Sequence, residues 1–199
     1  VFFIAACTSI LAVALICVFL FANGLPAIAE IGPLDFLLGR TWRPANDLYG
    51  IFPFILGSIY VTAGAIVIGV PIGILTSVFM AEYCPAKIYR PLKAATELLA
   101  GIPSVVYGFF GMLVLVPFIR ETTGSKGNVM LTACILLGIM ILPTIIGTTE
   151  SALRSVTRTY YEGALALGAT KERTIFTVML PAAKSGVLTG VVLGIGRAI

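Results

Sequence analysis

The chain has 199 residues, and its composition is that of a membrane protein. Hydrophobic residues make up 59% and charged residues only 11%, with a mean hydropathy of +1.07, whereas soluble domains carry about 25% charged residues. Histidine is absent, which excludes histidine-based general-base catalysis and most zinc sites. The net charge of +4 is typical of basic loops facing an anionic membrane surface and requires no nucleic-acid partner.

The cysteines indicate neither a disulfide framework nor a metal site. None forms a CxxC pair, and most fall inside apolar runs, where a thiol behaves as a small hydrophobe. We therefore expect all of them to be structural and unpaired, and no metal to be bound. They are Cys7, Cys17, Cys84 and Cys134.

Long apolar runs predict a single all-α domain over 1–199, a polytopic transmembrane helical bundle of about five spans. The uncharged run 1–22 is long enough to cross the hydrocarbon core and lacks the basic start of a signal peptide. Because apolar runs reach both ends of the sequence, we expect native segments to be missing at each terminus. The other expected spans are 55–80, 98–119, 127–149 and 182–199.

The segments between the spans are expected to be loops. Residues 23–49 are rich in glycine and proline and hold aromatic residues of the membrane-interface type. Residues 82–96 form a short loop, and the turn 120–126 makes the third and fourth spans a tight hairpin. Glu150, at the end of the fourth span, is expected to be a solvated interfacial charge.

Basic residues predict the orientation in the membrane. The segments 82–97 and 150–184 hold about eight lysines and arginines together, whereas 23–49 and 120–126 hold about four. We therefore expect the first pair of segments to be cytoplasmic.

The longest polar insertion, 162–181, is interpreted as two short helices around a bend. Gly168 is suited to the left-handed conformation that commonly closes a helix. Thr170 is a candidate N-cap, with Glu172 in the first turn, where a negative charge meets the positive end of the helix. The second helix presents an apolar face, which at a membrane surface indicates a protein partner. That face consists of Ile175, Phe176, Val178 and Met179.

The spacing within this insertion resembles the EAA signature of ABC-importer permeases. Gly163 stands where alanine is commoner, and Val178 where isoleucine is commoner. The resemblance implies a cytoplasmic coupling loop over 150–181 that docks into a groove of an ATPase; the alternative is an interfacial amphipathic loop without a special role. The residues assigned to ATPase coupling are Glu162, Gly163, Ala164, Gly168, Leu180 and Pro181.

Three further segments resemble the PstC-type permease family of phosphate-specific ABC importers. They are WRPANDLYG at 42–50, ELLAGIPSVVYG at 97–108 and GIGRA at 194–198. The resemblance covers nearly the whole chain and implies the type I, MetI-like permease fold in the cell (inner) membrane. It also implies four partners: a second phosphate permease subunit, an ATPase dimer, an external phosphate-binding protein, and phosphate itself.

No cofactor is expected on this chain, because it lacks the GxxxxGK[ST] phosphate loop. ATP is then used by the partner ATPase, and the chain itself is not an enzyme.

Arg197 is the leading candidate for the substrate path. It lies about eleven residues beyond Gly186, which at ~1.5 Å per residue is near the middle of the bilayer. A guanidinium at that depth usually faces a water-filled path or a bundle interior, and its planar fork suits phosphate oxygens. The alternative is a structural pair with a carboxylate.

Ser104 and Tyr107 are the other substrate-path candidates, because they place hydroxyls beside the helix break at Pro103. The alternative is that these hydroxyls satisfy carbonyls freed by the proline.

Other functions remain as alternatives. Permeases for sulfate or molybdate share the coupling motif. A secondary transporter needs acids inside the spans for proton or sodium coupling, and no Asp or Glu lies well inside any expected span. An intramembrane enzyme is disfavoured because the spans hold no paired carboxylates.

Overall fold

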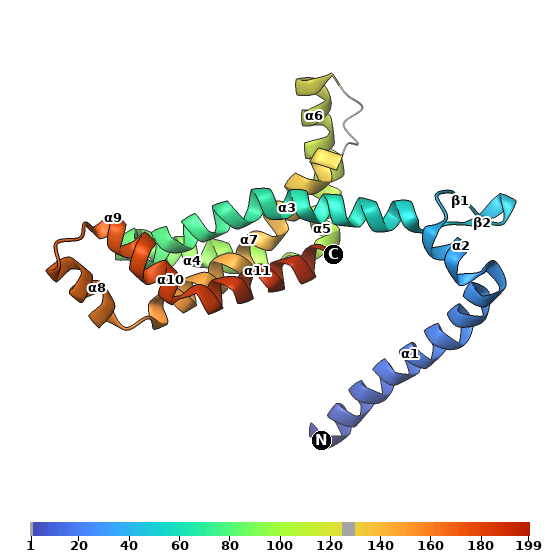
Figure 1. The fold of residues 1–199 in the computed structure, drawn as a ribbon, viewed down its shortest axis with the longest axis horizontal. Coiled ribbons are helices and arrows are strands. Elements are labelled where there is room, and N and C mark those ends of the chain that lie inside the picture. Colours follow the sequence, from blue (N-terminus) through green and yellow to red (C-terminus); the bar gives the residue numbers. More distant parts are fainter. Residues whose placement is uncertain (1, 125–129) are drawn as a thin grey trace. The chain divides into compact units, whose positions relative to one another are not determined.

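The computed structural model describes residues 2–124 and 130–199, which fold almost entirely into helices (Figure 1). Four helical stretches among them are long and apolar enough to cross a membrane. A fifth candidate is a bent pair, Lys171–Ala182 and Lys184–Ala198, whose axes differ by 71°. The all-α, polytopic class and the number of spans are thus confirmed. The four unbroken stretches are Phe2–Ile31, Phe52–Tyr83, Ser104–Thr123 and Met130–Ser155.

The chain divides into two units, the first ending at Gly57 and the second beginning at Ser58. In the first unit, helix α1 continues to Ile31, so the expectation of a loop from residue 23 is wrong there. The apolar residues that follow Pro26 extend the helix until Gly32 takes a φ of 94°. The elements of this unit are α1 (Phe2–Ile31), α2 (Pro33–Leu38), β1 (Trp42–Arg43), η1 (Pro44–Asn46) and β2 (Leu48–Tyr49).

The first unit contains a small β-hairpin. Strands β1 and β2 pair antiparallel, with Trp42 opposite Tyr49, and Asp47 takes the left-handed conformation before β2. The indole of Trp42 lies edge-on to Tyr49 at 5.8 Å and to Phe54 at 5.6 Å between ring centroids. These aromatic contacts order a segment that the sequence alone presents as a loop.

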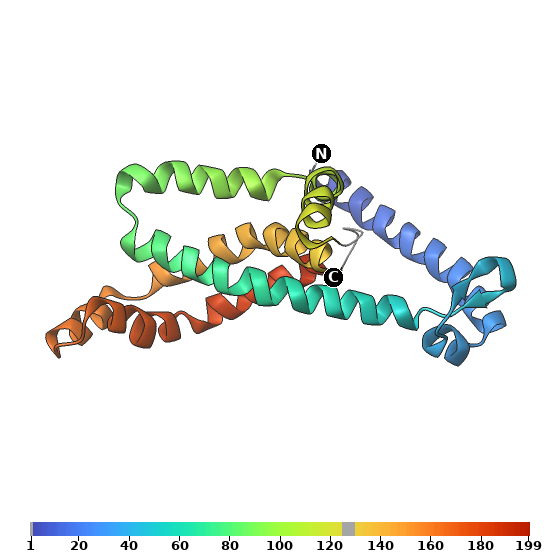
Figure 2. The same cartoon turned by 90° about the horizontal axis from the view of Figure 1, so that it is seen from above.

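The second unit is built around helix α7, which packs along α11 and against α3 (Figure 2). α3 begins in the first unit and continues into the second. The elements are α3 (Phe52–Val78), η2 (Phe79–Tyr83), α4 (Ala86–Gly101), α5 (Ser104–Phe110), η3 (Gly111–Leu115), α6 (Val116–Thr123), α7 (Met130–Ser155), α8 (Arg158–Ala166), α9 (Lys171–Thr174), η4 (Ile175–Met179), α10 (Leu180–Ala182) and α11 (Lys184–Ala198).

Small residues set the close approach of α3 to α7. A Cβ added at Gly69 would lie 2.8 Å from the side chain of Ile141, and one added at Gly73 would lie 2.8 Å from that of Ile145. Ile141 and Ile145 are fully buried. Glycine thus permits the tight packing that holds helices together in lipid, where burying apolar surface gives little driving force.

Two boundaries differ from the sequence-based expectation. Residues 82–96 were expected as a loop, yet most of them belong to α4, whose polar and apolar residues recur at helical spacing and give it one face to pack against α7. The expected third span 98–119 divides at Pro103, so that its first residues finish α4 and the span itself is Ser104–Thr123. A proline cannot donate the backbone hydrogen bond that would continue the helix.

The third and fourth spans contact each other where Gly111 lies against Leu136 of α7. The expected turn begins later than 120, since α6 continues to Thr123 and Gly124 ends it with a φ of 65°. The rest of that turn lies outside the described residues.

Candidate coupling loop and substrate path

The helix–turn–helix expected at 162–181 is confirmed. After α8, Gly168 adopts a φ of 86°, and the N–H groups of Gly168 and Ala169 bond back to the carbonyls of Leu165 and Ala164 at 2.9 and 3.1 Å. This is a helix C-cap that favours glycine. Because α7 continues to Ser155, the first six residues of the expected coupling loop 150–181 belong to that helix, and 156–181 is the candidate coupling loop.

Thr170 caps the second helix, also as expected. Its hydroxyl oxygen accepts a hydrogen bond from the backbone N–H of Arg173 at 3.3 Å, and Glu172 lies in the first turn of α9. The local sequence on both sides of the bend therefore determines the local structure.

The apolar face of the second helix is divided between the interior and the surface. Ile175 and Met179 are buried, and Ile175 packs with Val78 at the end of α3 and Leu153 at the end of α7. Phe176 stays exposed. Half of the face that was expected to meet a partner is therefore buried, and Ile175 anchors the loop to the ends of α3 and α7.

The residues assigned to ATPase coupling lie at two places in the loop. Glu162 and Gly163 are exposed on α8, with Ala164 half-buried beside them, and Gly168 forms the bend. Leu180 and Pro181 begin α10, just before the 71° bend into α11. The most exposed apolar side chain of the loop is Leu167, at 91%.

Leu167 was not singled out from the sequence. A leucine beside a helix-closing glycine was the available signal.

Two basic residues of the loop hold η2, the π-helical turn that ends α3. Arg158 Nη1 lies 3.2 Å from Glu82 Oε2. Lys171 Nζ donates to the carbonyl oxygen of Glu82 at 3.0 Å and lies 4.4 Å from the centre of the Tyr83 ring. The sequence carries no signal for these contacts, because the partners are 76 and 89 positions apart.

Glu150 is not a solvated interfacial charge, contrary to expectation. It is 1% exposed and accepts hydrogen bonds from Tyr89 Oη at 2.6 Å, Lys93 Nζ at 2.9 Å and Arg154 Nε at 2.8 Å. Tyr89 and Lys93 are one turn apart on α4, and Arg154 is one turn beyond Glu150 on α7. The carboxylate is buried because α4 lies over the end of α7.

The carboxylate of Glu150 also alters its partners on α4. The hydrogen bond to Glu150 raises the pKa of the Tyr89 hydroxyl, and desolvation adds to the effect. The same carboxylate raises the pKa of Lys93, outweighing the opposite effect of its partial burial. Tyr89 therefore stays neutral and Lys93 stays charged at neutral pH.

Arg154 links this cluster to η2. Its Nη2 donates to the carbonyl oxygen of Met80 at 3.1 Å, and its guanidinium lies 4.7 Å from the centre of the Tyr89 ring. We call Glu150, Arg154, Tyr89 and Lys93 the Glu150 cluster.

Arg197 lies in the last turn of α11 and is exposed. Its Nη1 is 3.5 Å from Thr144 Oγ1, beyond the usual 2.7–3.2 Å of a hydrogen bond. Among the described residues no carboxylate forms an ion pair with it. The structural alternative for Arg197 thus has no acidic partner in this part of the chain, and its contact with substrate stays a prediction.

Tyr107 donates its hydroxyl to the carbonyl oxygen of Leu99 at 2.9 Å. In a continuous helix this carbonyl would accept a hydrogen bond from the backbone N–H of residue 103. Pro103 has no N–H, so the hydroxyl of Tyr107 takes its place. The geometry of Tyr107 is therefore that of the structural alternative. Ser104 is exposed at the start of α5. Both helices, α5 and α11, contact α7.

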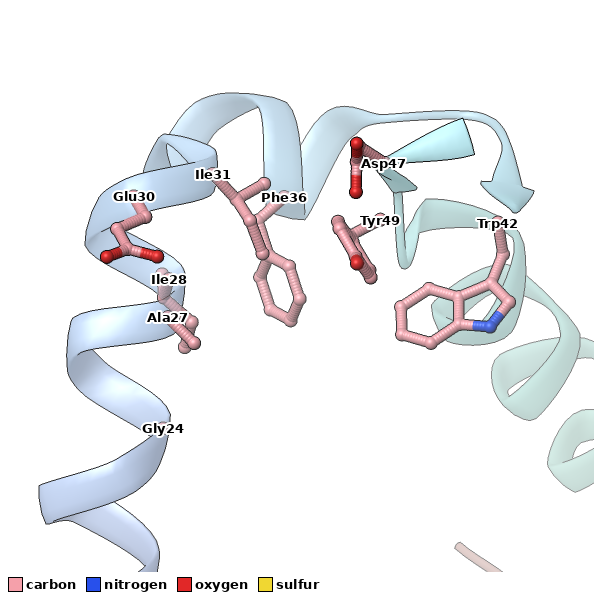
Figure 3. Close-up of a pocket in the computed structure, with 9 residues that line it drawn as sticks. All are labelled: Gly24, Ala27, Ile28, Glu30, Ile31, Phe36, Trp42, Asp47 and Tyr49. Atoms are coloured by element: carbon pink, nitrogen blue, oxygen red, sulfur yellow. The ribbon is translucent and has the colours of Figure 1, made fainter. Parts of the chain in front are cut away.

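A hollow of about 790 Å³ lies in the first unit, and sequence reasoning did not identify it. Figure 3 shows the rings of Phe36, Tyr49 and Trp42 in a row along it, with the carboxylates of Glu30 and Asp47 nearby. The described residues that line it include these two acids and no base, so the hollow does not suit an anion.

The four cysteines are free thiols, as expected. Across residues 2–124 and 130–199, no group of three His, Cys, Asp or Glu residues could hold a metal ion.

The fold is similar to that of a solved membrane transporter. A structure of the MetNI methionine ABC transporter in an inward-facing conformation matches with a TM-score of 0.57 and 22% identity, over 75% of this chain and 68% of that chain. At this identity the match establishes the MetI-like permease fold alone.

Curated relatives are similar over most of the chain. The "Probable ABC transporter permease protein YqgH" of Bacillus subtilis (strain 168) is 43% identical over 92% of this chain and 61% of its own length. The "Phosphate transport system permease protein PstC" of Mesorhizobium japonicum is 34% identical over 90% and 61%. The "Probable phosphate transport system permease protein PstC" of Methanocaldococcus jannaschii is 32% identical over 91% and 64%.

The chain thus spans less than two thirds of the length of these relatives. A family model covers the region that contains α7, the coupling loop and α11. Since residues 69–199 match the "Binding-protein-dependent transport system inner membrane component" model, the chain belongs to this family of multi-pass membrane proteins.

Proposed function

We propose that the chain is a permease subunit of an ABC importer that carries inorganic phosphate across the inner membrane. In this proposal the coupling loop is cytoplasmic and docks on a separate ATPase, which hydrolyses the ATP. The other partners are a second permease subunit, which shares the translocation path, and an external binding protein that delivers phosphate.

The observation that carries the proposal is the geometry of the coupling loop. Its bend is specified by Gly168 and its second helix by the Thr170 cap. Ile175 packs against Val78 of α3 and Leu153 of α7, Met179 is buried, and Leu167 is 91% exposed. An ordered loop that offers an apolar side chain to water is suited to insertion into a groove of a partner.

Phosphate is favoured as the substrate by two further points. Relatives named as phosphate permeases match over about nine tenths of the chain. Arg197 has a planar fork suited to phosphate oxygens and no paired carboxylate among the described residues. Sulfate and molybdate remain the rival oxyanions, since Arg197 suits them as well.

The test is reconstitution of the full-length protein together with the proteins that copurify with it. A tagged permease is purified from native membranes, its partners are identified by mass, and the complex is placed in proteoliposomes with ATP inside and the binding protein outside. We expect an ATPase subunit to copurify and labelled phosphate, but not sulfate or molybdate, to be imported. Import of sulfate alone would overturn the substrate, and a purified protein without an ATPase would overturn the coupling role.

A further inference from the structure

We propose that η2, the π-helical turn Phe79–Tyr83, transmits movement of the coupling loop to α3 and α4. In this proposal Arg158 and Lys171 are the positioning residues that hold η2. The inference rests on the proposed function, because it assigns residues to the coupling of ATP hydrolysis to transport.

The coupling loop holds η2 at both of its helices. Arg158 is the first residue of α8 and pairs with the carboxylate of Glu82; Lys171 is the first residue of α9 and bonds to the carbonyl oxygen of the same Glu82. Lys171 also lies over the ring of Tyr83. A displacement of α8 therefore pulls on Glu82, and a displacement of α9 pulls on Glu82 and Tyr83.

The side chain of Glu82 is suited to this role because it is only 5% exposed, whereas its partner Arg158 is 64% exposed. If Arg158 moves away, the carboxylate loses its only ion-pair partner among the described residues. Because leaving a buried charge unpaired is costly, the pair ties the position of Glu82 to that of Arg158.

At its other end, η2 is bound to the Glu150 cluster. Arg154 bonds to the carbonyl oxygen of Met80, and the same guanidinium is paired with Glu150. Glu150 in turn is bonded to Tyr89 and Lys93 of α4. The polar contacts run without interruption from α8 and α9 through η2 to α7 and α4.

The π-helical turn supplies the movable element in this chain of contacts. The N–H of Cys84 bonds to the carbonyl of Phe79 at 2.8 Å, the five-residue spacing of a π-helix. η3 and η4 are π-helical turns as well, and such turns often occur at functional sites. A shift between π and α spacing moves the following residues by one register step, which gives η2 two discrete arrangements that the coupling loop can bias.

The experiment uses the full complex of permease, partner subunit and ATPase in proteoliposomes. The double variant R158Q/K171M is compared with R173Q/K184M, which removes the same charge from neighbouring positions that form no contact with η2 among the described residues. The readouts are the number of phosphate ions imported per ATP hydrolysed and the amount of ATPase bound. We expect the import ratio of R158Q/K171M to fall at least about fivefold, the lower end of such couplings, while the ATPase stays bound.

A charge exchange, E82R/R158E, supplies the rescue, and we expect it to recover at least about half of the ratio lost in R158E alone, because the ion pair is restored with reversed polarity. If R158Q/K171M releases the ATPase, K171M alone is measured, since it keeps the pair between Glu82 and Arg158. A wild-type ratio in the variant, or an equal fall in R173Q/K184M, overturns the role of η2. A wild-type complex that lacks an ATPase or imports no phosphate overturns the proposed function instead.

Discussion

Lys93 Nζ lies 2.9 Å from Glu150 Oε2, although the two residues are 57 positions apart on α4 and α7. This contact makes α4, which lies between two candidate membrane spans and belongs to neither, a fixed part of the second unit. It also buries a carboxylate that would otherwise face water at the end of α7. The contribution of the Glu150 cluster can therefore be measured as a change in the free energy of unfolding.

Glu150→Gln should destabilise the protein, because the amide keeps the shape of the side chain but removes the negative charge that faces Lys93 and Arg154. These two side chains are 30% and 47% exposed, so water compensates part of the loss. We expect a loss of about 1–3 kcal/mol in the free energy of unfolding. Thermal unfolding in detergent measures it, with Glu121→Gln at an exposed position as the control. Equal midpoints for the two variants would contradict the role of the cluster.

Tyr89 and Lys93 should lose their stabilising effect at alkaline pH. The pKa of Tyr89 is raised above its ordinary 10.0, and that of Lys93 above its ordinary 10.5, both by the hydrogen bond to Glu150. A pKa that is higher in the folded protein means that the stabilisation is complete below the ordinary value and is lost as pH rises through the folded value.

The comparison is between the wild type and Tyr89→Phe/Lys93→Met. The difference in their unfolding free energies should be constant from about pH 6 to 9 and should shrink above about pH 10. Unfolding at a series of pH values measures it. If the difference in unfolding free energy instead shrank as the pH was lowered from about 9 to 6, groups other than Tyr89 and Lys93 would dominate it.

Gly168→Val should uncouple transport from ATP hydrolysis. No atom lies within 4 Å of a Cβ built at Gly168, so the strain comes only from its φ of 86°, which a β-branched residue disfavours by about 1–2 kcal/mol. Gly163→Ala is the control, because Gly163 is helical and also has open space around it. We expect phosphate uptake and substrate-stimulated ATPase activity to fall in Gly168→Val alone, with normal membrane insertion.

Arg197→Gln should abolish phosphate uptake while the complex still assembles. Arg197→Lys should keep the charge but lose the planar fork, so partial transport at most is expected. If Arg197 had only a structural role, its loss would instead lower the recovery of intact complex. Uptake and recovery are measured on the same membranes, and normal uptake by Arg197→Gln would exclude a role in the anion path.

The orientation can be tested with an impermeant thiol reagent in a variant whose four natural cysteines are replaced. A cysteine at Asn46, in η1, should be labelled from outside the cell. Cysteines at Lys87 and Arg173 should be labelled only after the membrane is permeabilised, because the excess of lysine and arginine predicts that these segments face the cytoplasm. The reverse pattern would place the coupling loop outside and remove its access to an ATPase.

Local features of the coupling loop could be predicted because neighbouring residues determine them. A glycine at the end of a helix and a threonine before the next one specify a left-handed closure and a cap within a few residues, as Gly168 and Thr170 do. The membrane spans could be predicted equally well, since the length of an apolar run is a property of the sequence itself. The boundaries of α1, α4 and α5 were harder to predict, because a helix continues through one proline and stops at another according to the tertiary surroundings.

The sequence by itself therefore determined the membrane class, the number of spans and the bend of the coupling loop, all of which depend on residues close together in the chain. Only the tertiary structure decided that Glu150 is buried, that Ile175 faces inward and that Arg158 meets Glu82. Each of these depends on which helix lies across from the residue. Partners on helices that are distant in sequence leave no periodic pattern in a single sequence. A charged residue that faces water cannot be told from one that faces a buried counter-charge by its residue type alone.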